Sequence, residues 1–243
     1  MSCFQIIPEI SVADGKAIVQ GRAVNCAELA HSLYMQGADG ILLNNVDKTM
    51  PGIAAMFRSV SEVSDRVFLP LRVSGAIYET AQIRIYINDG ADRVYYNSNG
   101  IRFPQYINDS VKKLGAHHVG AAIDCRKNQD MDIYQAYVGS GKISAGKDAT
   151  LWVHEAIERG VNDVLLNVKS DSEFDEGEIK EFMTKIGRCS APLFLRGSFS
   201  KKEHFALAHS LGVMGVVSSA FAQGTADMEG IKKQLSEMKI NVR

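Results

Sequence analysis

An acidic residue at the end of one apolar segment is well placed for acid–base chemistry. In the segment AAIDCRK, Asp124 follows a run of small and apolar residues, at the point where a predicted strand ends. A carboxyl group fixed there can donate a proton to a bound substrate or accept one from it. The alternative is an ion pair between Asp124 and Arg126 or Lys127 at the rim of the fold.

Small and polar residues end several other apolar segments. Backbone N–H groups can approach an anion at such turns, and the N-terminus of a following helix favours negative charge; the alternative is an ordinary tight turn. We assign these residues to the two ends of a ligand with two phosphate groups: Gly75, Asn97 and Ser98 at one end, and Gly197, Ser198, Ser218 and Ser219 at the other. The second set is expected to bind more strongly, because it has more donors.

The cysteines and histidines show no metal-binding pattern. The four cysteines are scattered without a CxxC pair, which indicates reduced thiols and a cytoplasmic protein. His117 and His118 are adjacent, and His31 and His154 occupy equivalent helical segments, which favours packing roles. We therefore expect neither a metal nor a cofactor.

The elements that position these residues alternate along the chain. Eight near-continuously apolar segments have the length of strands in a parallel sheet covered by helices. They are residues 4–12, 40–44, 67–75, 93–97, 118–125, 163–168, 192–197 and 215–219. Stretches with helical spacing lie between them, such as CAELAHSLYMQG and DATLWVHEAIERG, each ending on glycine. This order predicts an α/β fold, a single (β/α)₈ TIM barrel rather than a doubly wound sheet, with its active site at the carboxyl ends of the strands.

The chain also repeats at about half its length. Residues that recur 122 positions later are Pro70, Leu71, Gly75, Gly90 and Val94. We therefore expect one barrel over residues 1–243, built from half-barrels at about 1–117 and 118–243. At the first strand of each half the offset is smaller, 113 residues, because the second half carries extra residues in its first βα loop, DMDIYQAYVGSGKISAG. Ser11 therefore corresponds to Asp124, and Glu9, on the same face of the strand, is a candidate to supply the carboxylate that Ser11 lacks.

Charge and composition narrow the classes of partner. The 243 residues include 27 Lys and Arg against 28 Asp and Glu, so the net charge is -1 and no basic block is available for nucleic acid. No apolar run approaches the roughly 20 residues of a membrane helix, and the first residues do not form a secretion signal. We expect a small-molecule substrate and no nucleic-acid or membrane partner.

Six segments resemble the histidine-biosynthesis barrels, the family of the imidazole glycerol phosphate synthase cyclase subunit and its isomerase relative. They are IIPEISVADGK, GADRVYYNS, AAIDCRK, ERGVNDVLLN, KKEHF and KINVR. Three of these, AAIDCRK, ERGVNDVLLN and KINVR, are more similar to the cyclase than to the isomerase. The resemblance implies a bisphosphate substrate across the barrel mouth, with aspartates on strands 1 and 5 as acid and base. Asp124 matches one of these, but Ser11 replaces the other.

Three further features depart from the family pattern. The long closing loop after strand 1 is reduced to Gln20-Gly21 and residues 22–27, and the glycine-rich turn after strand 3 is reduced to Ser74-Gly75-Ala76. The phosphate turn after strand 6 is replaced by the acidic segment SDSEFDEG, residues 170–177.

The resemblance also implies a glutaminase partner, which would dock at the amino ends of the strands and send ammonia through the barrel. Positions that match the family's charged entrance are Gln5, Gly40, Arg93 and Asp163, and Asp92 matches an interface position. Two of the four entrance positions keep a charge, so we expect a glutaminase interface around Gln5, Asp92, Arg93 and Asp163.

The leading hypothesis is a divergent cyclase-like subunit that binds a phosphorylated substrate and uses ammonia from the glutaminase. One alternative is a genuine histidine-pathway cyclase, a lyase. Another is a barrel without chemistry of its own, acting as a scaffold or ammonia conduit in a sugar-amidation pathway. The replacement of one catalytic acid by Ser11 leaves open whether the chain is an enzyme.

Overall fold

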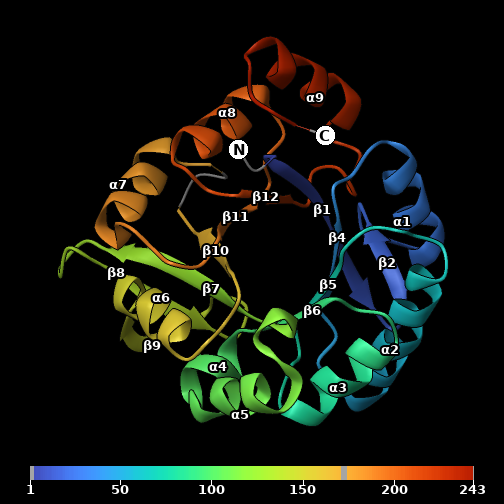
Figure 1. Ribbon diagram of the computed structural model, residues 1–243, viewed down its shortest axis with the longest axis horizontal. Helices are drawn as coiled ribbons and strands as arrows, with labels where there is room; N and C mark the ends of the chain where they lie inside the picture. Colours follow the sequence, from blue (N-terminus) through green and yellow to red (C-terminus); the bar gives the residue numbers. More distant parts are fainter. Residues whose placement is uncertain (1–2, 171–173, 243) are drawn as a thin grey trace.

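Eight parallel strands close into a barrel in the computed structural model, which describes residues 3–170 and 174–242 (Figure 1). The strands are β1 (Gln5–Ala13), β4 (Ile41–Asn45), β5 (Leu71–Ser74), β6 (Arg93–Tyr96), β7 (Val119–Asn128), β10 (Val164–Val168), β11 (Leu193–Gly197) and β12 (Gly215–Ser218). β1 pairs with both β4 and β12, and β7 pairs with both β6 and β10, so the ring has no open edge. The predicted (β/α)₈ barrel is confirmed.

Helices cover the outside of the ring. They are α1 (Cys26–Met35), α2 (Met50–Ser64), α3 (Thr80–Asn88), α4 (Ser98–Arg102), α5 (Gln105–Leu114), α6 (Ala149–Glu158), α7 (Glu176–Ile186), α8 (Lys202–Ser210) and α9 (Met228–Glu237), with a 3₁₀ turn η1 (Ala116–His118). Polar caps begin several of them, as sequence patterns predict. The Asn25 side chain accepts a hydrogen bond from the backbone N–H of Glu28 in α1, and Asp148 caps α6 in the same way.

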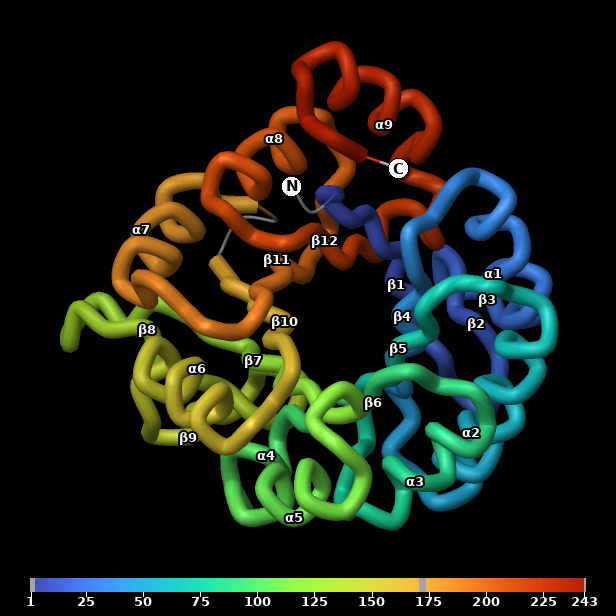
Figure 2. Tube along the Cα trace, in the orientation of Figure 1, coloured from blue at the N-terminus to red at the C-terminus, as the bar shows by residue number. Residues whose placement is uncertain are grey.

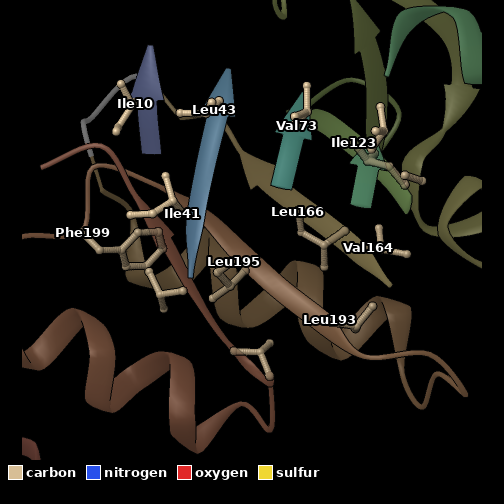
Figure 3. Packing of buried hydrophobic residues seen from close by; sticks show 14 of the residues in the cluster. Ile10, Ile41, Leu43, Val73, Ile123, Val164, Leu166, Leu193, Leu195 and Phe199 are labelled. Carbon is tan, nitrogen blue, oxygen red and sulfur yellow. The ribbon is translucent and has the colours of Figure 1, made fainter. Parts of the chain in front are cut away.

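Alternation along the strands creates two buried layers. One face packs against the helices, with Ile10, Leu43, Val73 and Ile123 among its members (Figure 3). The other face fills the barrel interior with a small apolar cluster: Ile7, Leu42, Tyr95, Ala122, Leu165, Phe194 and Val217. This inner cluster separates the mouth, at the carboxyl ends of the strands, from the floor, at their amino ends.

Each half-barrel carries an antiparallel hairpin after its first strand. β2 (Lys16–Val19) and β3 (Arg22–Val24) follow β1, whereas β8 (Ile133–Val138) and β9 (Ile143–Asp148) follow β7. Figure 2 shows the two hairpins on opposite sides of the barrel. The repeat therefore includes these excursions, and the second is longer, as its loop length indicates.

The structure differs from the sequence interpretation in two details. The eight strand segments predicted from the sequence include neither hairpin, although IYQAYV alternates between buried and partly exposed residues as a half-buried strand does. β5 begins at Leu71 rather than at residue 67, because Pro70 lacks a backbone donor and Phe68 is 80% exposed. Part of the acidic segment SDSEFDEG, residues 171–173, lies outside the described residues. Of the helices described, none has the length and hydrophobicity needed to cross a membrane.

Candidate functional site

A cavity of about 340 Å³ opens at the barrel mouth. Its wall includes Asp124 and the whole first set of predicted phosphate-binding residues, Gly75, Asn97 and Ser98. Four cationic side chains that the sequence interpretation did not single out also line it: Lys48, Arg102, Lys169 and Arg196. The mouth thus combines a carboxylate with positive charge, in a cavity lined from β4 through β7 to β10 and β11.

Asp124 is buried within β7, near the end of its pairing with β10, and is held by two amides. Asn97 donates through Nδ2 to one carboxylate oxygen at 3.0 Å, and Asn167 donates to the other at 2.6 Å. Lys127 pairs with Glu181 at 2.6 Å, so this lysine does not serve as the partner of Asp124. Because both oxygens accept hydrogen bonds from fixed amides, the carboxylate is held in one orientation towards the cavity.

The strand register supports the equivalence of Ser11 and Asp124. Ser11 lies beside Asn44 in the pairing of β1 with β4, and Asp124 lies beside Asn167 in the pairing of β7 with β10. Asn167 donates to Asp124, whereas Asn44 donates to Glu9 Oε1 at 3.0 Å. Each half-barrel therefore presents an asparagine to a carboxylate, but in the first half that carboxylate is Glu9.

Glu9 is not free to replace the missing acid. Its two oxygens accept hydrogen bonds from Arg196 Nε and Nη2 at 2.7 and 2.6 Å, and Glu9 is 7% exposed. Burial alone would lower the pKa of the Arg196 guanidinium, but the nearby Glu9 and Asp124 carboxylates raise it above its ordinary value. Both carboxylate oxygens of Glu9 are thus engaged by protein donors, so the geometry argues against Glu9 as the group that contacts a substrate.

The first set of anion-binding residues is open to the cavity. Gly75 has a φ of 83°, and a Cβ there would lie 2.1 Å from the backbone oxygen of Asn45, so the turn requires glycine. Ser98 is half-buried, and its Oγ accepts a hydrogen bond from the backbone N–H of Gly139 at 3.0 Å. Together with Asn97, these residues form one side of the mouth cavity.

The second set has little free space. Ser198 and Ser219 hydrogen bond to each other through their hydroxyl groups at 3.2 Å, and the buried Ser218 donates to the backbone oxygen of Phe199 at 2.7 Å. The adjacent cavity is only about 40 Å³, and the Phe199 ring packs close to Gly197. The geometry therefore offers a ligand more room beside the first set, and stronger binding by the second set stays a prediction.

The predicted entrance residues gather at the floor. Arg93 forms an ion pair with Asp163, and Tyr95 donates a hydrogen bond to Asp163 Oδ2 at 3.3 Å. Burial raises the pKa of the Asp163 carboxyl group, against the opposing influence of Arg93. A second cavity, of about 370 Å³, opens there and is lined by Gln5, Asp92, Arg93 and Asp163.

Two arginines inside apolar strand segments were missed by the sequence interpretation. Arg196 lies at the mouth, while Arg72 crosses the floor, where its Nη2 donates to Gln5 Oε1 at 3.2 Å and its guanidinium lies 5.3 Å from the Phe194 ring centre. Gly40 leaves room for Arg72, because a Cβ at this position would lie 2.6 Å from Nη1. The sequence did contain a signal for both residues: an arginine within a buried strand requires a hydrogen-bonding or oppositely charged partner inside the fold.

The thiols and potential metal ligands do not form a reactive centre. Burial raises the pKa of Cys26 to about 12 and that of Cys125 well above its ordinary value, so both thiols stay protonated near neutral pH. Across residues 3–170 and 174–242, no three His, Cys, Asp or Glu side chains are grouped so as to hold a metal ion.

The fold and mouth define a class of protein: a two-fold repeated (β/α)₈ barrel with a fixed carboxylate and a cation-lined cavity at the carboxyl ends of its strands. The chain belongs to the histidine biosynthesis protein family, whose model matches residues 5–227. Within that family, it is similar to proteins named imidazole glycerol phosphate synthase subunit HisF. The relative from Bacteroides fragilis is 27% identical over 248 residues, which cover 98% of both chains.

Two other HisF relatives are similar to this chain at comparable identity and over nearly their whole length. The protein from Campylobacter concisus is 29% identical over 247 residues, covering 98% of this chain and 97% of the relative. The protein from Streptococcus mutans is 28% identical over 250 residues, covering 98% of each chain. The chain is therefore a divergent HisF-like member, which confirms the resemblance seen in its sequence motifs.

Proposed function

We propose that this chain is a divergent cyclase-type subunit that binds a phosphorylated small molecule in the barrel mouth and uses ammonia from a glutaminase docked at the floor. The observation that carries the proposal is the fixed orientation of Asp124 in a cavity that four cationic side chains also line. Cations suit a phosphorylated ligand, and a fixed carboxylate suits proton transfer.

The local chemistry supports a substrate other than that of an ordinary histidine-pathway cyclase. Ser11 cannot accept a proton as a carboxylate does, and the Glu9–Arg196 ion pair occupies the interior nearby. The first hairpin is short, and Gln223 holds its turn by accepting from Gln20 N at 2.7 Å. Together these features favour a reaction different from the cyclisation carried out by a histidine-pathway cyclase.

The glutaminase part of the proposal draws on the floor. Arg93 and Asp163 retain opposite charges there, and two large apolar side chains near the amino ends of the strands are exposed: Phe68 by 80% and Met35 by 71%. Exposed aromatic and methionine side chains beside charged groups are typical of protein interfaces. A barrel that only conducts ammonia would share this interface, and Arg72 would lie in the path.

Binding measurements separate the proposal from the conduit alternative. Calorimetry with ribose 5-phosphate and with the substrate of imidazole glycerol phosphate synthase should detect binding to the wild-type chain and weaker binding to Asn97→Ala. Asp124→Asn should bind comparably but lose any turnover supported by ammonium. If neither compound binds and the chain still forms a stable complex with the glutaminase, the alternative of a non-catalytic ammonia conduit would be favoured.

A further inference from the structure

The turn between β8 and β9 reaches over the mouth cavity. Gly139, Ser140 and Gly141 have φ values of 64°, 63° and 76°, all in the left-handed region, and the first two line the cavity. A serine in this conformation is uncommon and is retained where the surroundings hold it. The contacts of Ser140 indicate what holds it.

Ser140 joins lysines from the two halves of the barrel. Lys48, between β4 and α2, donates through Nζ to Ser140 Oγ at 3.1 Å. Lys169, directly after β10, donates through Nζ to the backbone oxygen of Ser140 at 3.1 Å. Two ammonium groups that are far apart in sequence therefore meet at one residue on the cavity rim.

The oxygens that these lysines contact are neutral. Among residues 3–170 and 174–242, neither Lys48 nor Lys169 has a carboxylate within 4 Å. Two neighbouring positive charges repel each other and together attract an anion. A phosphate monoester, with up to two negative charges and several acceptor oxygens, can bridge two ammonium groups.

We propose that Lys48, Lys169 and the Ser140 hydroxyl form a phosphate-binding site at the rim of the mouth, distinct from the two sets of turn residues. This inference rests on the proposed function, because it places the phosphate of the same ligand. A phosphate there replaces Ser140 as the acceptor for both ammonium groups and receives a hydrogen bond from the Ser140 hydroxyl. The remainder of the molecule extends into the cavity, whose wall includes Asp124.

The other hairpin cannot make this contact. Its turn is fastened to the segment after β12, since Gln20 Nε2 donates to the backbone oxygen of Gln223 at 3.0 Å and Gln223 Nε2 donates to the Ile18 oxygen at 2.9 Å. The β8–β9 turn, in contrast, contacts Ser98 of α4 through Gly139. A phosphate at the rim would hold this turn over the bound ligand, which is the covering role that the short first hairpin does not perform.

The test is calorimetric titration with inorganic phosphate and with ribose 5-phosphate at constant ionic strength. Lys48→Met and Lys169→Met should each weaken binding about tenfold, as expected for the loss of one charge-assisted hydrogen bond. Lys142→Met removes the same charge from the same turn but should bind like wild type. Circular dichroism and urea unfolding establish that each variant is folded.

A second pair of variants uses Ser140 itself. Ser140→Asp places a carboxylate beside the two ammonium groups and should abolish phosphate binding. Ser140→Asn has a similar size, also tolerates the left-handed conformation and should retain measurable binding. Equal affinity in Ser140→Asp and Ser140→Asn would contradict the proposal.

The outcomes distinguish this site from the general function. Ribose 5-phosphate that binds Lys48→Met and Lys169→Met as tightly as wild type, but binds Asn97→Ala weakly, would overturn the rim site and leave the proposed function standing. Weaker binding in Lys48→Met and Lys169→Met, with wild-type binding in the control Lys142→Met, supports the rim site. No binding of either compound to wild type would overturn both.

Discussion

Arg196 on β11 donates two hydrogen bonds to the Glu9 carboxylate on β1, at 2.7 and 2.6 Å. The residue equivalent to Arg196 in the first half-barrel is Ser74, which donates instead to Asn44 Oδ1 at 3.0 Å. The ion pair is therefore a departure from the two-fold repeat, and it lies on the same face of β1 as Ser11.

Glu9→Gln should be strongly destabilising. The substitution leaves the buried Arg196 charge without its bidentate partner, and removal of one member of a buried pair typically costs about 3–5 kcal/mol. Urea unfolding followed by circular dichroism measures the loss. Replacing both residues with methionine should cost much less, because no charge is then left buried. A loss below about 1 kcal/mol in Glu9→Gln would show that the pair is well solvated.

Ser11→Asp should not restore an ordinary cyclase. A positioned acid or base contributes about 10²–10⁴-fold, so the wild-type chain should turn over the imidazole glycerol phosphate synthase substrate weakly with ammonium. The variant should gain less than about tenfold, since one acid supplies its effect only when the rest of the site is assembled. Steady-state turnover is the measurement, with Asp124→Asn as the inactive control.

A large recovery in Ser11→Asp would contradict this expectation. It would mean that the Glu9–Arg196 pair and the short first hairpin are compatible with the histidine-pathway reaction. The genuine-cyclase alternative would then be favoured.

Sequence patterns were sufficient for the barrel but not for its interior. The apolar strand segments predict the ring. The half-length repeat, with its smaller offset of 113 residues at strands 1 and 5, aligns Ser11 with Asp124, as the register of Asn44 and Asn167 bears out. The partner of Glu9 could not be predicted, because Arg196 is 187 positions away and only ring closure brings β11 near β1. The contacts of Lys48 and Lys169 with Ser140 could not be predicted either, because the sequence does not specify the direction in which the β8–β9 hairpin extends.

Asp92 is a poor probe of the glutaminase interface. It is exposed, as expected, but its Oδ2 accepts a hydrogen bond from the backbone N–H of Leu71 at 2.7 Å, at the start of β5. Asp92→Lys would therefore remove a hydrogen bond within the barrel, at a cost of about 1 kcal/mol, as well as a rim charge. Reduced docking in that variant would have two explanations.

Phe68→Lys provides a cleaner test of the glutaminase interface. Phe68 is 80% exposed near the amino end of β5, so the substitution should leave stability nearly unchanged. If Phe68 is an anchor of the interface, docking should weaken by about 2 kcal/mol, roughly 30-fold in Kd. Calorimetry with the glutaminase encoded nearest this gene measures the change. Met50→Lys, at the mouth end of α2, is the matched control and should dock normally.

The base of the second hairpin should respond to acid through Glu155. Burial tends to raise the pKa of Glu155, but hydrogen bonds from Arg159 and Lys147 lower it below its ordinary value of 4.5. The stabilisation is therefore present at neutral pH and is lost as pH falls below about 4.5 and through the lower folded-state value. Lys147 Nζ also lies 4.7 Å from the ring centre of Trp152, the sole tryptophan.

Trp152 fluorescence should consequently report protonation of Glu155. We expect a fluorescence change below pH 4.5 in wild type, because Lys147 loses its carboxylate partner and moves relative to the ring. In Glu155→Gln the signal should already be altered at neutral pH, and this part of the acid titration should disappear. Glu176→Gln, which removes an exposed partner of Lys180 on α7, should titrate like wild type. A wild-type titration in Glu155→Gln would mean that another carboxylate positions Lys147, and that the hairpin is anchored to α6 through Trp152 packing rather than through this ion pair.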